Sequence, residues 1–290
     1  MVLSPSSKIV FCEGKTDAQF LNKFFRSSSE ITIKETGSKR GMPSFASGFS
    51  DSTNRIAIQD RDLDFEPSID GKLVNAGKNW IWTTNKSSIE SYFLDEKLIF
   101  DYLNWKSSTP NYKSKSLSIP SADEISSFLM QAAKNIQFYE AARWALADAK
   151  SSILDAKFDD KWFADSGKIP IFERLDKDSN YQEAQSIIVE YLRKMEILDT
   201  NKLLKDFEKR CIQFSSNDFY ENKEYLVWFH GKDLKTSFSN IISTEFARNW
   251  HFSFDTFLND FCKIERIELQ FDISKHKDLM ELKDKISNLK

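Results

Sequence analysis

Short apolar runs alternate with longer helical repeats over the first hundred residues. The runs at 9–12, 31–33, 56–59 and 80–84 are rich in β-branched and aromatic side chains and are typical of buried strands. Helical spacing of apolar residues follows the first run, with Thr16 and Gln19 as a predicted capping box, and recurs over 88–103. Because parallel strands need crossover connections, this alternation predicts an α/β layer with a mainly parallel sheet.

Beyond about residue 105 the apolar spacing is mostly helical. A polar stretch with two prolines at 104–120 predicts a boundary loop, and Ser121 with Glu124 forms a capping box at the start of the next helix. Further amphipathic segments are expected at 181–198, 202–214, 233–249, 254–262 and 275–289, with 226–229 as a strand or a buried connector. We therefore expect two domains, covering 1–105 and 106–290, of which the second is mostly α-helical.

Composition narrows the classes of protein. The chain has 290 residues and a formal net charge of −3, which excludes a uniformly basic nucleic-acid coat, and its 25 Phe and 7 Trp supply ample material for a core. The three cysteines, Cys12, Cys211 and Cys262, are too few and too widely spaced for a disulfide framework or a CxxC zinc site. With no long apolar segment in the sequence, these features predict a soluble protein of the reducing cytoplasm.

Carboxylates stand directly after two predicted strands. Glu13 follows the first strand, and the third strand ends in Asp60, Asp62 and Asp64, alternating with Arg61 and Leu63. In parallel sheets ligands bind beyond the carboxyl ends of the strands, and neighbouring first and third strands would bring Glu13, Asp60 and Asp62 together. Such close carboxylates repel one another unless a cation lies among them, and their hard oxygen atoms suit Mg²⁺ or Mn²⁺. This arrangement predicts a metal-dependent phosphoryl-transfer site, with Lys39, Arg40 and Arg61 as candidates for guiding a phosphate chain.

Other interpretations of the acidic segment remain open. It is also compatible with a solvated loop, although the apolar strand before it argues against that interpretation. Haloacid-dehalogenase phosphatases have a similar DxD, but there a Thr or Val stands two residues past the second Asp, where this chain has Asp64. Glycosyltransferase DxD sites do not require Glu13. His230 is a poor metal ligand because His251 and His276 show no ligand spacing with it.

Two segments together resemble the Toprim fold. They are Ile9-Val10-Phe11-Cys12-Glu13-Gly14-Lys15-Thr16-Asp17 and Ile56-Ala57-Ile58-Gln59-Asp60-Arg61-Asp62. Glu90, within Ser88 to Leu94, and the later His230-Gly231-Lys232-Asp233-Leu234 are similar to small Toprim nucleases that accompany an ABC-type ATPase. The chain most resembles the AriB-type effectors of PARIS phage-defence systems. The Toprim likeness covers about residues 5–105, and the likeness to these effectors extends more weakly through the helical part.

The resemblance implies a role for each matching residue. Glu13 would act as a general acid or base and join the metal shell, and Asp60 and Asp62 would bind Mg²⁺ or Mn²⁺. Asp64 and Glu90 are further candidate metal ligands, Glu90 by its position rather than by a strict motif. Lys232 would neutralise the charge that develops on the phosphate, and it could equally belong to an ordinary helix start with Asp233 in the first turn.

The resemblance also implies a biological setting. It is that of a metal-dependent endonuclease, with tRNA favoured over DNA, that acts as the toxic effector of an abortive-infection system. An ABC-type ATPase would hold the effector until a phage trigger is sensed, and a homodimer would be its active form. The helical part, 106–290, would serve docking, dimerisation and closure over the substrate. The sequence has no Walker A loop, so nucleotide hydrolysis would come from the ATPase partner.

Two rival functions follow from the same residues. The first is the Toprim module of a topoisomerase or primase, which is disfavoured because the chain has no zinc-ribbon cysteines. The second is a catalytically idle binding or regulatory subunit, in which the acidic cluster holds a structural cation. The presence of Glu13, Asp60 and Asp62 together argues against that second alternative.

Overall fold

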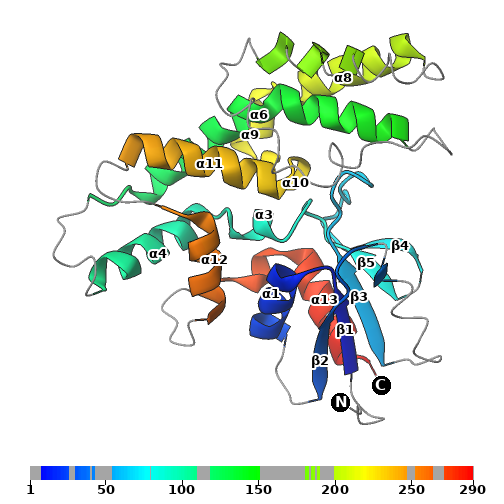
Figure 1. Cartoon of the computed structure of the whole chain (residues 1–290), viewed down its shortest axis with the longest axis vertical. Coiled ribbons are helices and arrows are strands. Elements are labelled where there is room, and N and C mark those ends of the chain that lie inside the picture. Colours follow the sequence, from blue (N-terminus) through cyan, green and yellow to red (C-terminus); the bar gives the residue numbers. More distant parts are fainter. Residues whose placement is uncertain are drawn as a thin grey trace. The chain divides into compact units, whose positions relative to one another are not determined.

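The chain divides into two compact units, whose helices and strands are labelled in Figure 1. The computed structural model describes residues 8–25, 30–39, 41–42, 54–78, 80–109, 118–150, 180–182, 184–186, 188–189, 199–246, 252–263 and 271–289. The first unit comprises 1–61, 67–89 and 259–290, and the second comprises 62–66 and 90–258. These units do not coincide with the boundary near residue 105 that the sequence suggests, because the C-terminal segment belongs with the N-terminal one.

The first unit is built on a five-stranded sheet. Its strands are β1 (Lys8–Cys12), β2 (Ile31–Glu35), β3 (Arg55–Gln59), β4 (Val74–Lys78) and β5 (Ile81–Thr83), in the spatial order β2-β1-β3-β5-β4. The pairs β1–β2, β1–β3 and β3–β5 are parallel, and β4 pairs with β5 in the antiparallel sense. The prediction of an α/β fold with a mainly parallel sheet is confirmed.

The sequence pattern did not indicate β4. Its residues, Val-Asn-Ala-Gly-Lys, include Asn, Gly and Lys, which are depleted in strands, and the pairing with β5 shifts register between Asn75 and Lys78. This strand lies at the edge of the sheet, where an irregular strand is better tolerated than in the centre. Its pairing with β5, rather than its own composition, accounts for its extended conformation.

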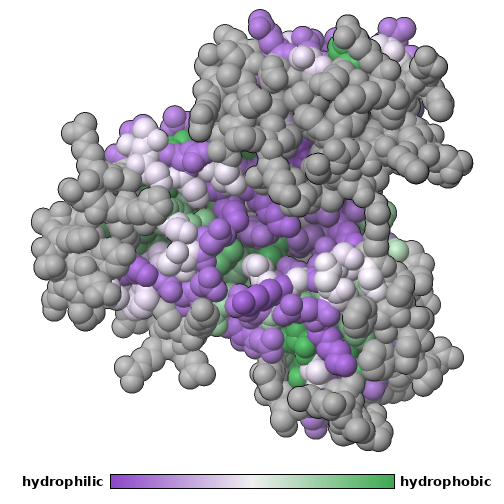
Figure 2. Space-filling model, viewed as in Figure 1, coloured by the Kyte–Doolittle hydropathy of each residue, from purple (hydrophilic) through white to green (hydrophobic). Residues whose placement is uncertain are grey.

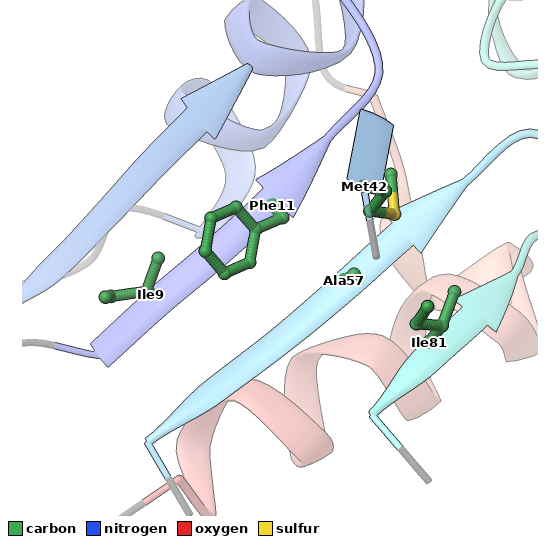
Figure 3. Close-up of a cluster of buried hydrophobic side chains, with 5 residues drawn as sticks. All are labelled: Ile9, Phe11, Met42, Ala57 and Ile81. Carbon is green, nitrogen blue, oxygen red and sulfur yellow. The ribbon is translucent and has the colours of Figure 1, made fainter. Parts of the chain in front are cut away.

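Each face of the sheet buries apolar side chains. Helices α1 (Lys15–Phe25) and α13 (Lys277–Ser287) cover one face, where Phe20 and Leu21 of α1 and Leu279 of α13 line a pocket with Ile58 of β3. On the opposite face, Figure 3 shows a buried cluster of side chains from the central strands and from Met42. That cluster consists of Ile9, Phe11, Met42, Ala57 and Ile81. Burial on both faces explains why the central strands read as nearly continuous apolar runs.

Helix α13 is fixed to the sheet by polar contacts as well as apolar ones. The Asp278 carboxylate accepts a hydrogen bond from the Asn85 backbone N–H at 2.7 Å, and the Glu281 carboxylate accepts one from Leu73 N–H at 3.1 Å. Lys8 of β1 donates to the Ser287 carbonyl at 2.9 Å. These contacts join residues that are separated by 193 to 279 positions in the chain and make α13 an integral part of the first unit.

The described part of the second unit is helical. Its helices are α3 (Glu90–Phe93), α4 (Glu96–Ser108), α6 (Ala122–Lys150), α8 (Thr200–Phe214), α9 (Asn217–Glu221), α10 (Tyr225–Trp228) and α11 (Gly231–Phe246). Helix α12 (Phe254–Lys263) begins in this unit and ends in the first, which also holds the short 3₁₀ helix Ile273–Lys275. The long helix α6 packs against α4, α8 and α11. The predicted helical character of this part of the chain is confirmed for the described residues.

Several predicted elements differ from the structure. The single helix expected over 88–103 is two helices, because Asp95 ends the first and caps α4 by accepting a hydrogen bond from Leu98 N–H at 2.8 Å. Helix α4 continues to Ser108, so the loop expected from 104 begins later. The strand considered for 226–229 is the short helix α10, with Phe229 buried directly after it. Most of the predicted helix 181–198 lies outside the described residues.

The capping box at Ser121 is confirmed. The Glu124 carboxylate accepts hydrogen bonds from the Ser121 N–H and hydroxyl, both at 2.8 Å, and the Ser121 hydroxyl accepts one from Glu124 N–H at 3.2 Å.

Figure 2 shows hydrophilic residues over much of the coloured surface on the face it presents. In the part of the chain that is described, no helix is long and apolar enough to cross a membrane.

Candidate functional site

The first half of the candidate site lies where the connections of the sheet change direction. The chain moves from β1 outward to β2, and then returns to place β3 on the other side of β1. In open α/β sheets, ligands bind at such a switch point, beyond the carboxyl ends of the two strands. Glu13 directly follows β1, and Asp60 directly follows β3. The topology alone therefore singles out these two carboxylates.

A hydrogen bond joins the two strand ends. The Asp60 backbone N–H donates to Glu13 Oε1 at 3.0 Å, and Asp60 Oδ1 accepts a hydrogen bond from Ile89 N–H at 3.0 Å. Each carboxylate is thus oriented by a backbone donor. The predicted proximity of Glu13 and Asp60 is confirmed by this contact, while their chemical roles remain predictions.

The turn after β1 holds Glu13 in place. The Gly37 N–H donates to the Glu13 carbonyl at 2.8 Å, and the Asp17 carboxylate accepts a hydrogen bond from Gly14 N–H at 2.9 Å. Helix α1 begins at Lys15, so Asp17 lies in its first turn and favours the positive end of the helix dipole. The sequence predicted a cap formed by Thr16 and Gln19, whereas Asp17 forms the observed one.

Asp60 borders an apolar pocket. The pocket is small and lies between α1, β3 and α13. Its walls are mainly the side chains of Phe20, Leu21, Ile58, Ile89, Leu279 and Leu282, with Asp17 and Asp60 among the few polar residues. Apolar walls beside a carboxylate strengthen its electrostatic interactions, because less water is present to screen them.

Asp62, the next candidate carboxylate along the chain, belongs to the second unit. The boundary between the units falls between Arg61 and Asp62. Asp62 has a left-handed backbone, with φ of 49°, and its Oδ1 lies 3.0 Å from Nε2 of His230, a side chain with no exposed surface. At the other end of the same loop, Glu66 accepts a hydrogen bond from Arg210 at 2.6 Å. The acidic loop 62–66 is therefore held at both ends by the helical unit.

Sequence reasoning missed the part that His230 plays. It named His230 within the segment that resembles Toprim nucleases, and set it aside as a metal ligand because the other histidines show no ligand spacing with it. In the structure the ring contacts a candidate metal-binding carboxylate, Asp62, across 168 positions of sequence. No local pattern could indicate that contact. The only available signal was that a histidine stands directly before a predicted helix start.

A buried cluster of charged residues contacts the backbone of His230. Arg143 of α6 forms ion pairs with Asp233 of α11 and, at 3.5 Å, with Glu140, whose other carboxylate oxygen accepts a hydrogen bond from His230 N–H at 3.1 Å. Burial raises the pKa of Glu140 well above its ordinary value of 4.5, against the effect of Arg143, and the nearby Asp233 raises it further. Arg143 and Asp233 pair with each other, while burial disfavours the charged form of Glu140.

Replacing Glu140 with glutamine is expected to stabilise the protein by an amount that grows with pH. A carboxyl group whose pKa is raised in the folded state contributes stability that is fully present below pH 4.5 and is lost as the pH rises toward its folded pKa. Glutamine stays neutral and its carbonyl oxygen can still accept from His230 N–H. Urea unfolding of Glu140→Gln and the wild type between pH 4.5 and 8 measures the difference.

Glu124→Gln on the same helix is the matched control for this prediction. Hydrogen bonds from the Ser121 backbone and hydroxyl lower the pKa of Glu124, so its contribution has the opposite sign and is lost as the pH falls. The Glu124 variant should therefore lose stability relative to the wild type only as the pH rises through the range below 4.5, and at higher pH the difference should stay constant. If the Glu140 variant and the wild type kept a constant difference at every pH, a raised pKa of Glu140 would be ruled out.

The remaining predicted site residues have varied surroundings. Asp64 is exposed, and Lys232 is half-buried in the first turn of α11, which confirms that residues 230–233 start a helix. Lys39 is half-buried after β2, and Arg40 lies outside the described residues. Arg61 has no exposed surface and donates to the Asn85 carbonyl at 3.0 Å. That burial argues against Arg61 as a ligand of a phosphate chain and in favour of a structural role in the loop after β3.

The donor atoms present are of the type that Mg²⁺ prefers. Glu13, Asp60, Asp62 and Glu90 all supply carboxylate oxygens, and Glu90 Oε2 is buried with no hydrogen-bond partner among the described residues. A buried carboxylate oxygen without a partner is costly unless a cation or water satisfies it. No group of three or more His, Cys, Asp or Glu side chains is close enough to hold a metal within the described ranges. Single residues therefore fit a hard cation, and the complete ligand set remains a prediction.

Comparisons with known proteins add no assignment. No protein-family model matches the chain, and no curated protein matches its sequence.

Proposed function

We propose that the chain is a Toprim-type, metal-dependent endonuclease that cleaves phosphodiester bonds of nucleic acid. The observation that carries this proposal is the hydrogen bond from Asp60 N–H to Glu13 Oε1 at the switch point of the sheet. Two carboxylates at the carboxyl ends of adjacent parallel strands, each oriented by a backbone donor, supply both a metal ligand and a group for proton transfer.

Each residue has a defined part in the proposed reaction. Asp60 and Asp62 would hold Mg²⁺ or Mn²⁺, with Asp64 and Glu90 as further candidate ligands. The bound metal would polarise the scissile phosphate and offset the negative charge that builds on it. Glu13, beside Asp60, exchanges a proton with the attacking or leaving oxygen. Lys232 supplies a positive charge toward the phosphate.

The proposed biological role rests on the resemblance of the matching residues to PARIS effectors. In that role the chain is the toxic effector of an anti-phage system, held by an ABC-type ATPase in the cytoplasm until a phage trigger is sensed. tRNA is favoured over DNA as the substrate, and a homodimer is the proposed active form. The part formed by residues 106–290 would provide docking, dimerisation and closure over the substrate.

The first experiment asks whether the isolated chain cuts nucleic acid. Purified protein is incubated with total tRNA and with supercoiled plasmid, in Mg²⁺, Mn²⁺ or EDTA, and the products are separated on denaturing gels. We expect discrete tRNA fragments in the presence of metal and none in EDTA. Intact tRNA and plasmid under all conditions would favour the alternative of an idle binding subunit. Relaxation of the plasmid without cut products would favour the topoisomerase-type alternative.

The Glu13→Gln variant tests the proposed proton transfer. Glutamine can still accept the hydrogen bond from Asp60 N–H, so the loop should stay folded while the proton-transfer group is lost. We expect the cleavage rate to fall by about 10²-fold, the lower end of what a general acid or base contributes.

Glu35→Gln provides the matched control. Glu35 is an exposed carboxylate at the end of β2, paired in register with Cys12 of β1. Its replacement should leave the rate within twofold of the wild type. Equal losses in both variants would show that general charge at this edge of the sheet, rather than Glu13 itself, supports the reaction.

A further inference from the structure

Asp62 and His230 form a buried pair in the second unit. The Asp62 side chain is 11% exposed and the His230 side chain is 0% exposed. Their atoms Oδ1 and Nε2 are 3.0 Å apart, a normal hydrogen-bond distance. Little water can compete for this contact, so its geometry is set by the protein.

The backbone of the next helix determines which ring nitrogen carries the proton. The Lys232 N–H donates to His230 Nδ1 at 3.3 Å, so Nδ1 acts as an acceptor. A histidine ring that accepts at Nδ1 carries its proton on Nε2. Nε2 therefore donates to Asp62 Oδ1. A carboxylate has about four acceptor positions on its two oxygens, and the hydrogen bond from His230 occupies one of them and orients Asp62.

His230 itself is fixed by its backbone. Its N–H donates to Glu140 at 3.1 Å, and its carbonyl accepts from the N–H groups of Asp233 and Leu234 at 3.1 and 3.0 Å. The ring thus projects from the rigid start of α11. A ring held in this way can impose an orientation on a partner.

Asp62 has a rare backbone conformation that the contacts around it must enforce. Its φ of 49° lies in the left-handed region, which glycine adopts without steric cost and other residues occupy rarely. Such a conformation persists where the surrounding contacts enforce it, and it is concentrated at functional sites. The contact with His230 is one that holds the Asp62 carboxylate in a single direction.

We infer that His230 is a positioning residue that holds Asp62 in its metal-binding orientation. This inference rests on the proposed function, because it assumes that Asp62 binds Mg²⁺ or Mn²⁺. It goes further by assigning a role to a histidine that is not itself a ligand. Partners that orient metal ligands commonly change metal affinity by 10–100-fold when they are removed.

Two variants separate the contacts of the His230 ring. In His230→Asn, the shorter side chain can accept from Lys232 N–H in place of Nδ1 but does not reach Asp62. In His230→Gln, the longer amide nitrogen can donate to Asp62 in place of Nε2. Mn²⁺ binding to the full chain is measured by electron paramagnetic resonance of the free ion. Circular dichroism in EDTA establishes that each variant is folded.

The inference predicts that His230→Asn raises the Mn²⁺ dissociation constant by about 10-fold or more, while His230→Gln stays within about threefold of the wild type. An unchanged constant for His230→Asn, or an equal loss in both variants, would overturn it. Unfolding of His230→Asn in EDTA would assign the contact to stability and would also overturn it. A wild type that binds no Mn²⁺ would instead refute the proposed function, so the two failures are distinguishable.

Discussion

Arg143→Met should destabilise the second unit by about 3–5 kcal/mol, the usual cost of leaving a buried charge without its partner. Arg143 has no exposed surface and forms ion pairs with Asp233 and Glu140. Burial opposes its charge, but Asp233, Tyr139 and Glu140 raise the pKa of Arg143 above its ordinary value. Methionine fills similar space but cannot compensate the Asp233 carboxylate.

A double-mutant cycle isolates the ion pair from the loss of packing. Urea unfolding is measured for Arg143→Met, Asp233→Asn and the double variant. In the double variant no uncompensated carboxylate remains at Asp233, so it should recover at least half of the stability that Arg143→Met loses. Additive losses in the double variant would mean that Arg143 stabilises the unit by packing alone.

Asp60→Asn should lower the rate of metal-dependent cleavage by about 10³-fold or more, because it removes a metal-binding charge from the site. The asparagine carbonyl can still accept from Ile89 N–H, which Asp60 Oδ1 does at 3.0 Å. The backbone N–H that donates to Glu13 is unaffected. The variant therefore changes charge while preserving the hydrogen bonds of the turn.

Asp70→Asn is the control for charge in the same unit. Asp70 is exposed, and hydrogen bonds from Ser68 and Lys72 lower its pKa to about 2, so it is ionised as the proposed site residues must be. Rates on labelled tRNA and thermal melting are compared for both variants. The control should cleave within twofold of the wild type. More than a tenth of wild-type activity in Asp60→Asn would remove Asp60 from the proposed metal site.

The sheet and half of the candidate site could be predicted because their determinants are local. Buried parallel strands show up as apolar runs, and parallel neighbours end at the same edge of the sheet, so Glu13 and Asp60 could be expected there. The hydrogen bond between them follows from that adjacency. Strand β4 was not predicted because its extended conformation depends on pairing with β5 rather than on its own residues.

The other half of the site could not be predicted because its determinants are distant in sequence. The contact between Asp62 and His230 spans 168 positions, and the pair of Arg143 and Asp233 spans 90. Glu140 and Arg143 of α6 continue the helical spacing of Ile136 at i+4 and i+7, so they lie on the apolar face of the helix, where charged side chains are not expected. Their burial is explained only by partners on α11. The helix predicted over 88–103 was wrong for a more local reason. Asp95 caps α4 and interrupts an apolar repeat that is otherwise continuous.

The strands of the sheet are synthesised long before α13, the helix that packs on one of its faces. Asp278 and Glu281 of α13 accept hydrogen bonds from Asn85 and Leu73, so the first unit lacks these contacts until α13 has been made. Roughly 190 residues separate Ile89 from α13, which corresponds to a delay of about 10–40 s at ordinary translation rates. The helical unit can thus fold on the nascent chain first. The proposed nuclease would therefore gain these contacts at the edge of its sheet only late in synthesis.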